Sequence, residues 1–561
     1  MDWRALAKQK RESTIAQIPK EWVLPTIPPP AEQRDISGVW MHQYLTPEEI
    51  EITSSDAEKV VELASAGRWK AVDIASAFCH RAAIAHQVLN CLHEFFPQQA
   101  LEAARALDEH LTSTGKPKGV LHGLPVSLKD QFHVKGVETT MGYLGWIGTF
   151  EGKKGTGKER VHESLMVKDL KDLGAVLYCK TAVPSTLMSG ETVNNIIDYC
   201  WNSANRNLSS GGSSGGEGAL IGAGGSVVGF GTDIGGSIRI PAAFNGLYGL
   251  RPSSGRLPYE GMANSMDGQN SILSVVGPLS STPGGLKLVT KALLGMQPWS
   301  YDPMVVELPW REEVGEQVSR RATEDGGLTF AIFWDDGEIR PYPSVRRALE
   351  KVKAEIEKKG HQVIEWSPPK SIGAISDIAM GVFMSDGGVD AYNAFALAHE
   401  EPAPQLAPIV PTTPRTQATA SEVAAMNVTI RELRKELMDY WNSTVSLTKN
   451  GRPIDAIISP VSPYPAARRE MYTHYAYTSW VNALDWTTVV IPVLRTDKAV
   501  DVVDPSFTPR SEAEKLEFEN YDLDMYDGAK VGVQLVGRRL QEEKMIEIAA
   551  QVSRWVKSAS E

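Results

Sequence analysis

Hydrophobic and polar positions follow two different periods along this chain. Helical spacing of apolar residues runs from residue 55 onward and recurs at 71–88, 98–111, 284–295, 344–359 and 542–556. Short apolar runs typical of buried strands occupy 125–128, 175–180, 329–334, 361–366, 456–459, 489–493 and 531–536. Because strands alternate with helices, we expect an α/β protein with a large mixed, mostly parallel sheet covered by helices on both faces.

The same pattern predicts how the chain is organised. Residues 1–50 combine a short amphipathic helix with a proline-rich arm and are expected to form a strap over the main body. Residues 51–550 should form a single domain, with a helical layer before its first core strand, and residues 551–561 a tail. Within the domain, 151–163 is expected to be a solvated loop and 296–328 irregular and exposed. Residues 370–450 should be helical with a proline-rich break, so 296–450 is predicted to be the more variable, substrate-side region.

A glycine- and serine-rich stretch at 209–251 departs from both periods. Its glycines come in pairs and are interleaved with Ala, Leu, Ile, Val and Phe, whereas a flexible linker is polar throughout. This composition predicts buried backbone that turns tightly and passes close to other groups. Ser213 and Ser237 each follow a glycine pair. Backbone N–H groups exposed beside a serine suit acyl-transfer chemistry.

Charge and composition narrow the class of protein. Lys and Arg number 57 against 69 Asp and Glu, so the net charge is −12, which argues against nucleic acid as a partner. The four cysteines show no metal-ligand spacing, and free buried thiols in a reducing compartment are the simpler interpretation. The charged N-terminus has no signal core and no window is apolar enough for a membrane span, so we expect a cytoplasmic protein that uses no membrane. The sequence leaves room for a homodimer.

Three chemistries compete over the glycine-rich stretch. A phosphate loop is disfavoured because no G-x-G-x-x-G or GK[ST] pattern is completed. A nucleophile elbow at Ser213 has the G-x-S-x-G letters, but His361, His399 and His474 lack a convincing strand-end context. A serine nucleophile served by a lysine base would use Lys129, at the end of an apolar strand, provided burial keeps it neutral. Lys129 could instead merely extend its charged end to solvent or pair with Asp130, and composition alone favours that simpler interpretation.

Three segments contain the candidate residues: GLPVSLKD contains Lys129, GGSSGGEGAL contains Ser213, and GTDIGGSIRIPAAF contains Ser237. Together they resemble the amidase signature family, and within it the fungal acetamidases. Further matching pieces are KTAVPSTLM, GLRPSSGRLP, DAIISPV and VGVQLVGRR, so the resemblance extends over roughly residues 50–550.

This resemblance implies a cofactor-independent, metal-independent amidase that hydrolyses a small carboxamide to an acid and ammonia. Ser237 would be the nucleophile, Ser213 on a cis peptide the proton shuttle, and Lys129 the base. The N–H groups of Ile234, Gly235, Gly236 and Ser237 would form the oxyanion hole. Asp233 and Arg239 are expected to form an internal ion pair beside this loop.

Three other functions stay open at this point. The chain could act on a larger or secondary-metabolite amide, or be an amidotransferase subunit. It could also be a non-catalytic binding protein with the same fold.

Overall fold

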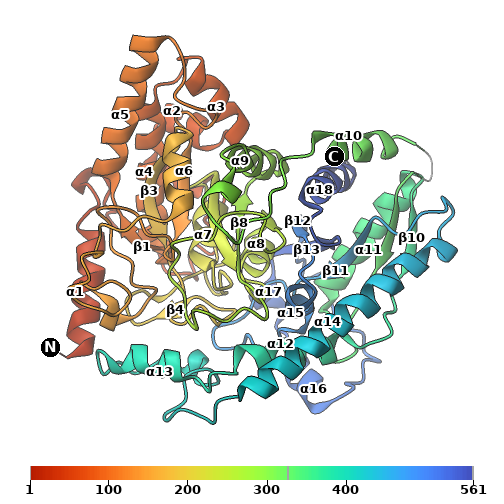
Figure 1. Cartoon of the computed structure of the whole chain (residues 1–561). Helices are drawn as coiled ribbons and strands as arrows, with labels where there is room; N and C mark the ends of the chain where they lie inside the picture. The colour runs from red at the N-terminus through yellow and green to blue at the C-terminus, as the bar shows by residue number, and fades with distance from the viewer. Residues whose placement is uncertain (1, 325–326, 559–561) are drawn as a thin grey trace.

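The core of the protein is one large sheet. A computed structural model describes residues 2–324 and 327–558, and its main sheet has eleven strands in the order β1-β3-β2-β6-β8-β7-β12-β13-β11-β9-β10 (Figure 1). The strands of this sheet are β1 (Leu92–Phe95), β2 (Pro125–Lys129), β3 (Val176–Thr181), β6 (Val228–Asp233), β7 (Tyr248–Arg251), β8 (Val275–Ser280), β9 (Thr329–Ile332), β10 (Gln362–Glu365), β11 (Ala456–Pro460), β12 (Thr488–Arg495) and β13 (Lys530–Val536). A separate two-stranded ladder pairs β4 (Val193–Asn194) with β5 (Asp198–Tyr199).

Eighteen α-helices surround the sheet in the described part of the chain. They are α1 (Trp3–Ile15), α2 (Pro47–Thr53), α3 (Ala57–Ser65), α4 (Ala71–Leu89), α5 (Pro97–Thr114), α6 (Leu165–Asp172), α7 (Gly215–Gly222), α8 (Arg239–Asn245), α9 (Pro283–Gly295), α10 (Glu312–Arg321), α11 (Pro343–Lys358), α12 (Ile372–Phe383), α13 (Val389–Ala396), α14 (Ala420–Ser443), α15 (Ala476–Leu484), α16 (Glu512–Glu519), α17 (Leu523–Tyr526) and α18 (Glu542–Ser558). None of the described helices is long and apolar enough to cross a membrane.

Helices cover both faces of the sheet, as the pattern predicts. In β12, Val489 and Ile491 pack with α11 and α18, whereas Val490 points into the opposite cluster with α8. Successive strand side chains point to opposite faces, so both faces of β12 are buried. The expectation of a large mixed sheet between two helical layers is therefore confirmed.

Parallel pairing is confined to the two flanks of the sheet. Strands β3, β2 and β6 are parallel neighbours, as are β11, β9 and β10, and the strand pairs between these groups are antiparallel. The centre is thus less parallel than expected. Parallel neighbours need a crossover, usually a helix, but β7 reaches β8 through the helix-free loop 252–274.

The glycine-rich stretch supplies central strands that the sequence pattern did not predict. Strands β6 and β7 both lie in it, and glycine is ordinarily unfavourable in strands. Here it is required by close packing, since a Cβ on Gly229 would lie 2.1 Å from Glu217 Oε2. A Cβ on Gly277 in β8 would meet Leu250 O at 2.2 Å.

Two other expectations need correction. Strand β1 precedes β2, so the N-terminal helices do not form a layer ahead of every core strand. Residues 296–328 are not wholly irregular, because α10 forms there and packs against α18. Its sequence EEVGEQVSRR contains only two apolar side chains, Val314 and Val318, and only Val318 is buried. The helical prediction for 370–450 is confirmed by α12, α13 and α14.

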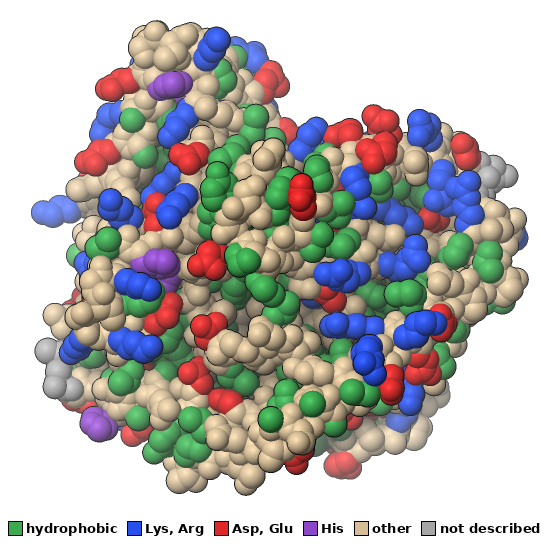
Figure 2. Space-filling model, in the orientation of Figure 1, with side chains coloured by type: hydrophobic (Ala, Val, Ile, Leu, Met, Phe, Trp, Pro, Cys, Tyr) green, Lys and Arg blue, Asp and Glu red, His purple; other side chains and the backbone are tan. Residues whose placement is uncertain are grey.

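The ends of the chain are tied to the main body. Helix α1 places Lys10 against the carboxylates of Glu94 and Glu138, and the N-terminal arm donates Ile36 N–H to Ser203 O. Residues 551–558 continue α18, while 559–561 lie outside the described residues. Basic and acidic side chains are interspersed over the face shown in Figure 2.

Candidate active site

Lys129 lies where three parallel strands end together. It is the last residue of β2, between β3 and β6. Its Nζ atom donates to Ser213 Oγ at 2.8 Å and to Thr232 Oγ1 at 2.7 Å. The carboxyl ends of parallel strands are the usual place for chemistry in such sheets, and Ser213 and Lys129 meet there although 84 residues separate them.

Burial sets the protonation of Lys129. Desolvation lowers the pKa of its ammonium from 10.5 to about 7, while the charges of Asp233 and Glu217 oppose that shift. The alternative that Lys129 pairs with Asp130 is excluded, because Asp130 Oδ1 lies 3.0 Å from Lys180 Nζ. Lys129 can therefore be neutral near pH 7, as a lysine base requires.

Ser213 sits in a turn built by glycine. The Gly212–Ser213 peptide is cis, as the family resemblance implies, and Gly211 has φ +83°. The next amide, Ser214 N–H, donates to Ser237 O at 3.2 Å and so holds the two serine turns against each other. Ser214 Oγ bonds to the backbone of Thr232, in agreement with a structural role for that side chain.

The turn that carries Ser237 is fixed by a buried ion pair. Arg239 Nε lies 3.0 Å from Asp233 Oδ2, which confirms the expected pairing. Asp233 also accepts the N–H groups of Gly236 at 2.9 Å and Ile238 at 3.2 Å. Although burial alone would raise the pKa of Asp233, Arg239 holds it far below its usual range, so the carboxylate stays charged.

These bonds change the set of amides expected to face an oxyanion. The N–H of Gly236 is engaged by Asp233 and points away from that task. The N–H groups of Ile234, Gly235 and Ser237 have no acceptor within 2–324 and 327–558. The sequence argument missed this because it treated a glycine pair as two exposed amides, without the side chain that caps one of them.

The three candidate side chains differ in their access to solvent. Lys129 is 0 % exposed, Ser213 1 % and Ser237 8 %. In the described part of the chain, the Ser237 hydroxyl forms no hydrogen bond. An incoming molecule would therefore meet Ser237 first, with Ser213 and Lys129 behind it.

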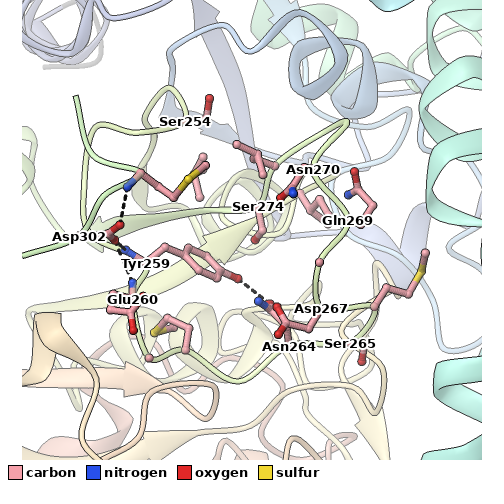
Figure 3. A pocket seen from close by; sticks show the side chains of 18 of the residues that line it. Ser254, Tyr259, Glu260, Asn264, Ser265, Asp267, Gln269, Asn270, Ser274 and Asp302 are labelled. Atoms are coloured by element: carbon pink, nitrogen blue, oxygen red, sulfur yellow. Dashed lines mark hydrogen bonds between the residues drawn. The ribbon is translucent and has the colours of Figure 1, made fainter. Parts of the chain in front are cut away.

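A cavity of about 460 Å³ reaches the Ser237 turn at Ile234 (Figure 3). Phe383 lies on its wall and would be 3.6 Å from a Cβ on Gly235. Most of the wall comes from the loop between β7 and β8, where Tyr259 Oη donates to Asn264 Oδ1 at 2.8 Å. The cavity is also lined by residues of the predicted solvated loop at 151–163 and, in the region expected to vary, by Asp302 and Phe383.

The other interpretations of the glycine-rich stretch lose support. Gly216 and Gly218 lie in α7, where a Cβ on Gly216 would meet Ala182 N at 2.2 Å, so these glycines serve close packing and not a phosphate loop. Ser213 bonds to lysine, whereas His474 bonds to Asp336. Asp336, Glu338 and His474 bring ligand-type atoms within 4.8 Å of one another, in a cluster that includes none of the three candidate residues. The four cysteines are buried free thiols.

Sequence reasoning missed two polar side chains that complete the lysine's surroundings. Thr232 accepts from Lys129, and Gln131 in turn accepts from Thr232. Gln131 lies in the turn after β2 and not in the strand, so strand alternation could not place its side chain beside Lys129. Thr232 had no signal either, since β6 itself was not predicted.

Comparisons with known proteins show which family the chain belongs to. The Amidase family model matches residues 73–546. The chain is 43% identical to an acetamidase of Aspergillus oryzae and 42% identical to an acetamidase of Emericella nidulans, over 98% of both chains in each case. A solved fatty acid amide hydrolase superposes with a TM-score of 0.89 at 31% identity, covering 98% of this chain and 95% of that one. This chain therefore belongs to the amidase signature family and is an amidohydrolase.

Proposed function

We propose that the protein hydrolyses the C–N bond of a small carboxamide through an acyl-serine intermediate on Ser237. The observation that carries this proposal is the 2.8 Å contact between Lys129 Nζ and Ser213 Oγ, which is buried beside Ser237, the more accessible of the two serines. A neutral amine in that position can accept a proton that Ser213 passes on from Ser237.

The first half of the reaction forms the ester. Ser237 Oγ bonds to the amide carbon, its proton passes to Ser213, and the Ser213 proton passes to Lys129. The carbonyl oxygen, now negative, is met by the free N–H groups of Ile234, Gly235 and Ser237. When the C–N bond breaks, Lys129 returns a proton through Ser213 to the leaving nitrogen, and ammonia departs.

The second half returns the enzyme to its starting state. Water bonds to the ester carbon and gives its proton to Lys129 by the same route. The C–O bond to Ser237 then breaks, Ser237 regains a proton, and the carboxylic acid leaves. No step requires a cofactor or a metal, because the lysine supplies the base and the backbone supplies the charge stabilisation.

An acetamide-like monocarboxylic amide is the proposed substrate, since two acetamidases are similar to this chain over nearly their whole length. A larger amide is the second candidate, and the 460 Å³ cavity at Ile234 favours it, because drug-sized ligands occupy cavities of about 300–1,000 Å³. Ammonia release should be measured over acetamide, longer aliphatic amides and benzamides. The acyl size with the highest kcat/KM decides between the two.

The assignment of the nucleophile is tested with a fluorophosphonate. We expect labelling at Ser237, loss of labelling in Ser237→Ala, and loss of turnover in the same folded variant. Labelling at Ser213, or turnover retained by folded Ser237→Ala, would overturn the mechanism. Full ammonia release by the isolated chain would also exclude a role restricted to an amidotransferase complex.

A further inference from the structure

Behind Lys129, a chain of hydrogen bonds leads through Thr232 and Gln131 to the loop that walls the cavity. Lys129 Nζ bonds to Thr232 Oγ1, and Thr232 Oγ1 donates to Gln131 Oε1 at 2.5 Å. Gln131 Nε2 donates to Ala263 O at 2.8 Å, with longer contacts to Asn264 and to Tyr259. Gln131 is fully buried.

The donor and the acceptor of each hydrogen bond in this series are fixed by its last member, the carbonyl of Ala263. The Ala263 carbonyl can only accept, so the amide nitrogen of Gln131 faces it and the amide oxygen faces Thr232. That oxygen can also only accept, so Thr232 must spend its single hydroxyl proton on Gln131. Thr232 therefore offers Lys129 a lone pair and never a proton.

This constraint matters because a neutral amine has one lone pair. If Thr232 could donate to Lys129, the two hydroxyl groups of Thr232 and Ser213 would compete for that lone pair. With the Thr232 proton held by Gln131, one Lys129 N–H is directed to Thr232 and the lone pair is left for the proton of Ser213. We propose that Gln131 is a positioning residue that orients the neutral Lys129 amine toward Ser213 by fixing the direction of the Thr232 hydroxyl.

The inference rests on the proposed role of Lys129 as base, and it adds a reason for a carboxamide at position 131. A carboxylate there would still accept from Thr232 but could not donate to Ala263, and it would put a negative charge one hydroxyl away from the lysine. Two carboxyl groups, those of Asp233 and Glu217, already act on Lys129. Asp233 is paired with Arg239, and burial raises the pKa of Glu217 to about 8. The neighbouring Asp130 is paired with Lys180. A new anion would be unpaired, and it would raise the pKa of Lys129.

The test compares Gln131→Met and Gln131→Glu with wild type in steady-state kinetics over pH 5–10, using the amide that wild type hydrolyses best. For Gln131→Met we expect kcat to fall roughly 10- to 100-fold with KM nearly unchanged, because orientation of a proton acceptor acts on the chemical step. For Gln131→Glu we expect the acid limb of kcat/KM to move up by about one pH unit or more.

A double variant separates orientation from loss of structure. Adding Thr232→Val to Gln131→Met removes the competing hydroxyl, so kcat should fall no further and should partly recover. Multiplicative losses in the double variant would overturn the inference, as would a wild-type kcat and pH profile in Gln131→Met. Gln87→Met is the matched control and should leave kcat unchanged. Gln87 in α4 also makes three hydrogen bonds, with Trp22, Leu24 and Ala83, and none of them involves the residues around Lys129.

Failure of this inference is distinguishable from failure of the proposed function. Wild-type hydrolysis and labelling at Ser237 are measured in the same series. If wild type hydrolyses the amide and is labelled at Ser237 while Gln131→Met has wild-type kinetics, the positioning role of Gln131 is wrong and the Ser237 mechanism stands. If Ser237 is not labelled, the proposed function itself falls.

Discussion

Asp233 and Arg239 form a bidentate ion pair inside the turn that presents Ser237, with Arg239 Nη2 3.0 Å from Asp233 Oδ1 and Nε 3.0 Å from Oδ2. The same carboxylate caps Gly236 and Ile238. The Asp233 carboxylate therefore both neutralises Arg239 and holds the backbone of the Ser237 turn.

Replacing Asp233 with Asn should destabilise the protein by about 3–5 kcal/mol, because it leaves Arg239 buried without its counter-charge. The free energy of unfolding from urea titration is the measurement. The exposed pair between Lys435 and Asp439 is the control, since Asp439→Asn should change stability by less than about 1 kcal/mol. Equal effects at the two sites would contradict the importance of burial.

The proposed triad should behave as a unit. We expect Lys129→Ala and Ser213→Ala each to lower kcat by roughly 10³-fold or more, and the double variant to be no worse than either single variant. Thermal unfolding shows whether the variants are folded, and Lys168→Ala on the surface of α6 is the neutral control. Independent, multiplicative losses would show that the two residues do not share one proton path.

The pH dependence of activity should follow Lys129. Because burial lowers its pKa to about 7, kcat/KM should rise as pH increases through about 7, where the ammonium becomes the neutral base. Titration of initial rates from pH 5 to 9 at fixed ionic strength tests this. A flat profile across that range would mean that Lys129 does not titrate in the free enzyme.

The stability of the protein should also depend on the protonation of Lys129, because burial disfavours its charged form. The Lys129 pKa is about 7 in the folded chain and near 10.5 in the unfolded chain, so the unfolded chain binds more protons between those values. The penalty for burying Lys129 is greatest below pH 7 and disappears above pH 10.5. Lys129→Met should therefore stabilise the protein by about 2–4 kcal/mol at pH 6, with the gain shrinking as pH rises through this window.

Backbone conformation at Gly236 should be as important as the side chains. It has φ +129°, and an added Cβ would lie 2.6 Å from Thr478 Oγ1. We expect Gly236→Ala to cost about 1–3 kcal/mol of stability and most of the activity. Gly235→Ala is the matched control for stability, since its Cβ would have only an ordinary 3.6 Å contact with Phe383.

Phe383 should limit the size of the acyl group. Shortening it to Ala enlarges the cavity beside Gly235, so the ratio of kcat/KM for benzamide to that for acetamide should rise about tenfold. The ratio is independent of the fraction of enzyme that is folded. Phe507→Ala should leave the ratio unchanged, because Phe507 stacks on Phe518 of α16 and does not line the cavity. An unchanged ratio in Phe383→Ala would remove Phe383 from the acyl site.

The spacing of apolar residues predicted the helices and strands that are stabilised by burial of regular apolar faces. The helices at 344–359 and 542–556 and the strands at 329–334 and 531–536 could be read from apolar spacing, because each buries one or two regular faces. Strands β6 and β7 could not, since their glycines are chosen by contacts with distant segments such as Glu217.

The site could be predicted only in outline. Lys129, Ser213 and Ser237 were found through motif resemblance, and the structure brings Lys129 and Ser213 into contact. The engagement of the Gly236 amide and the Thr232–Gln131 bond depend on three-dimensional side-chain placement. Neither interaction produces a repeating pattern in the sequence.

Part of the buried support of the Ser237 turn comes from the last fifth of the chain. Arg239 donates to Gln534 Oε1 at 3.1 Å, and Asn482 donates to Asp233 at 2.8 Å. During biosynthesis, Lys129, Ser213 and Ser237 leave the ribosome long before these partners exist. A nascent chain therefore holds all three candidate side chains early but completes the support of Arg239 only when β13 joins the sheet, so we expect a chain that ends before residue 534 to lack hydrolytic activity.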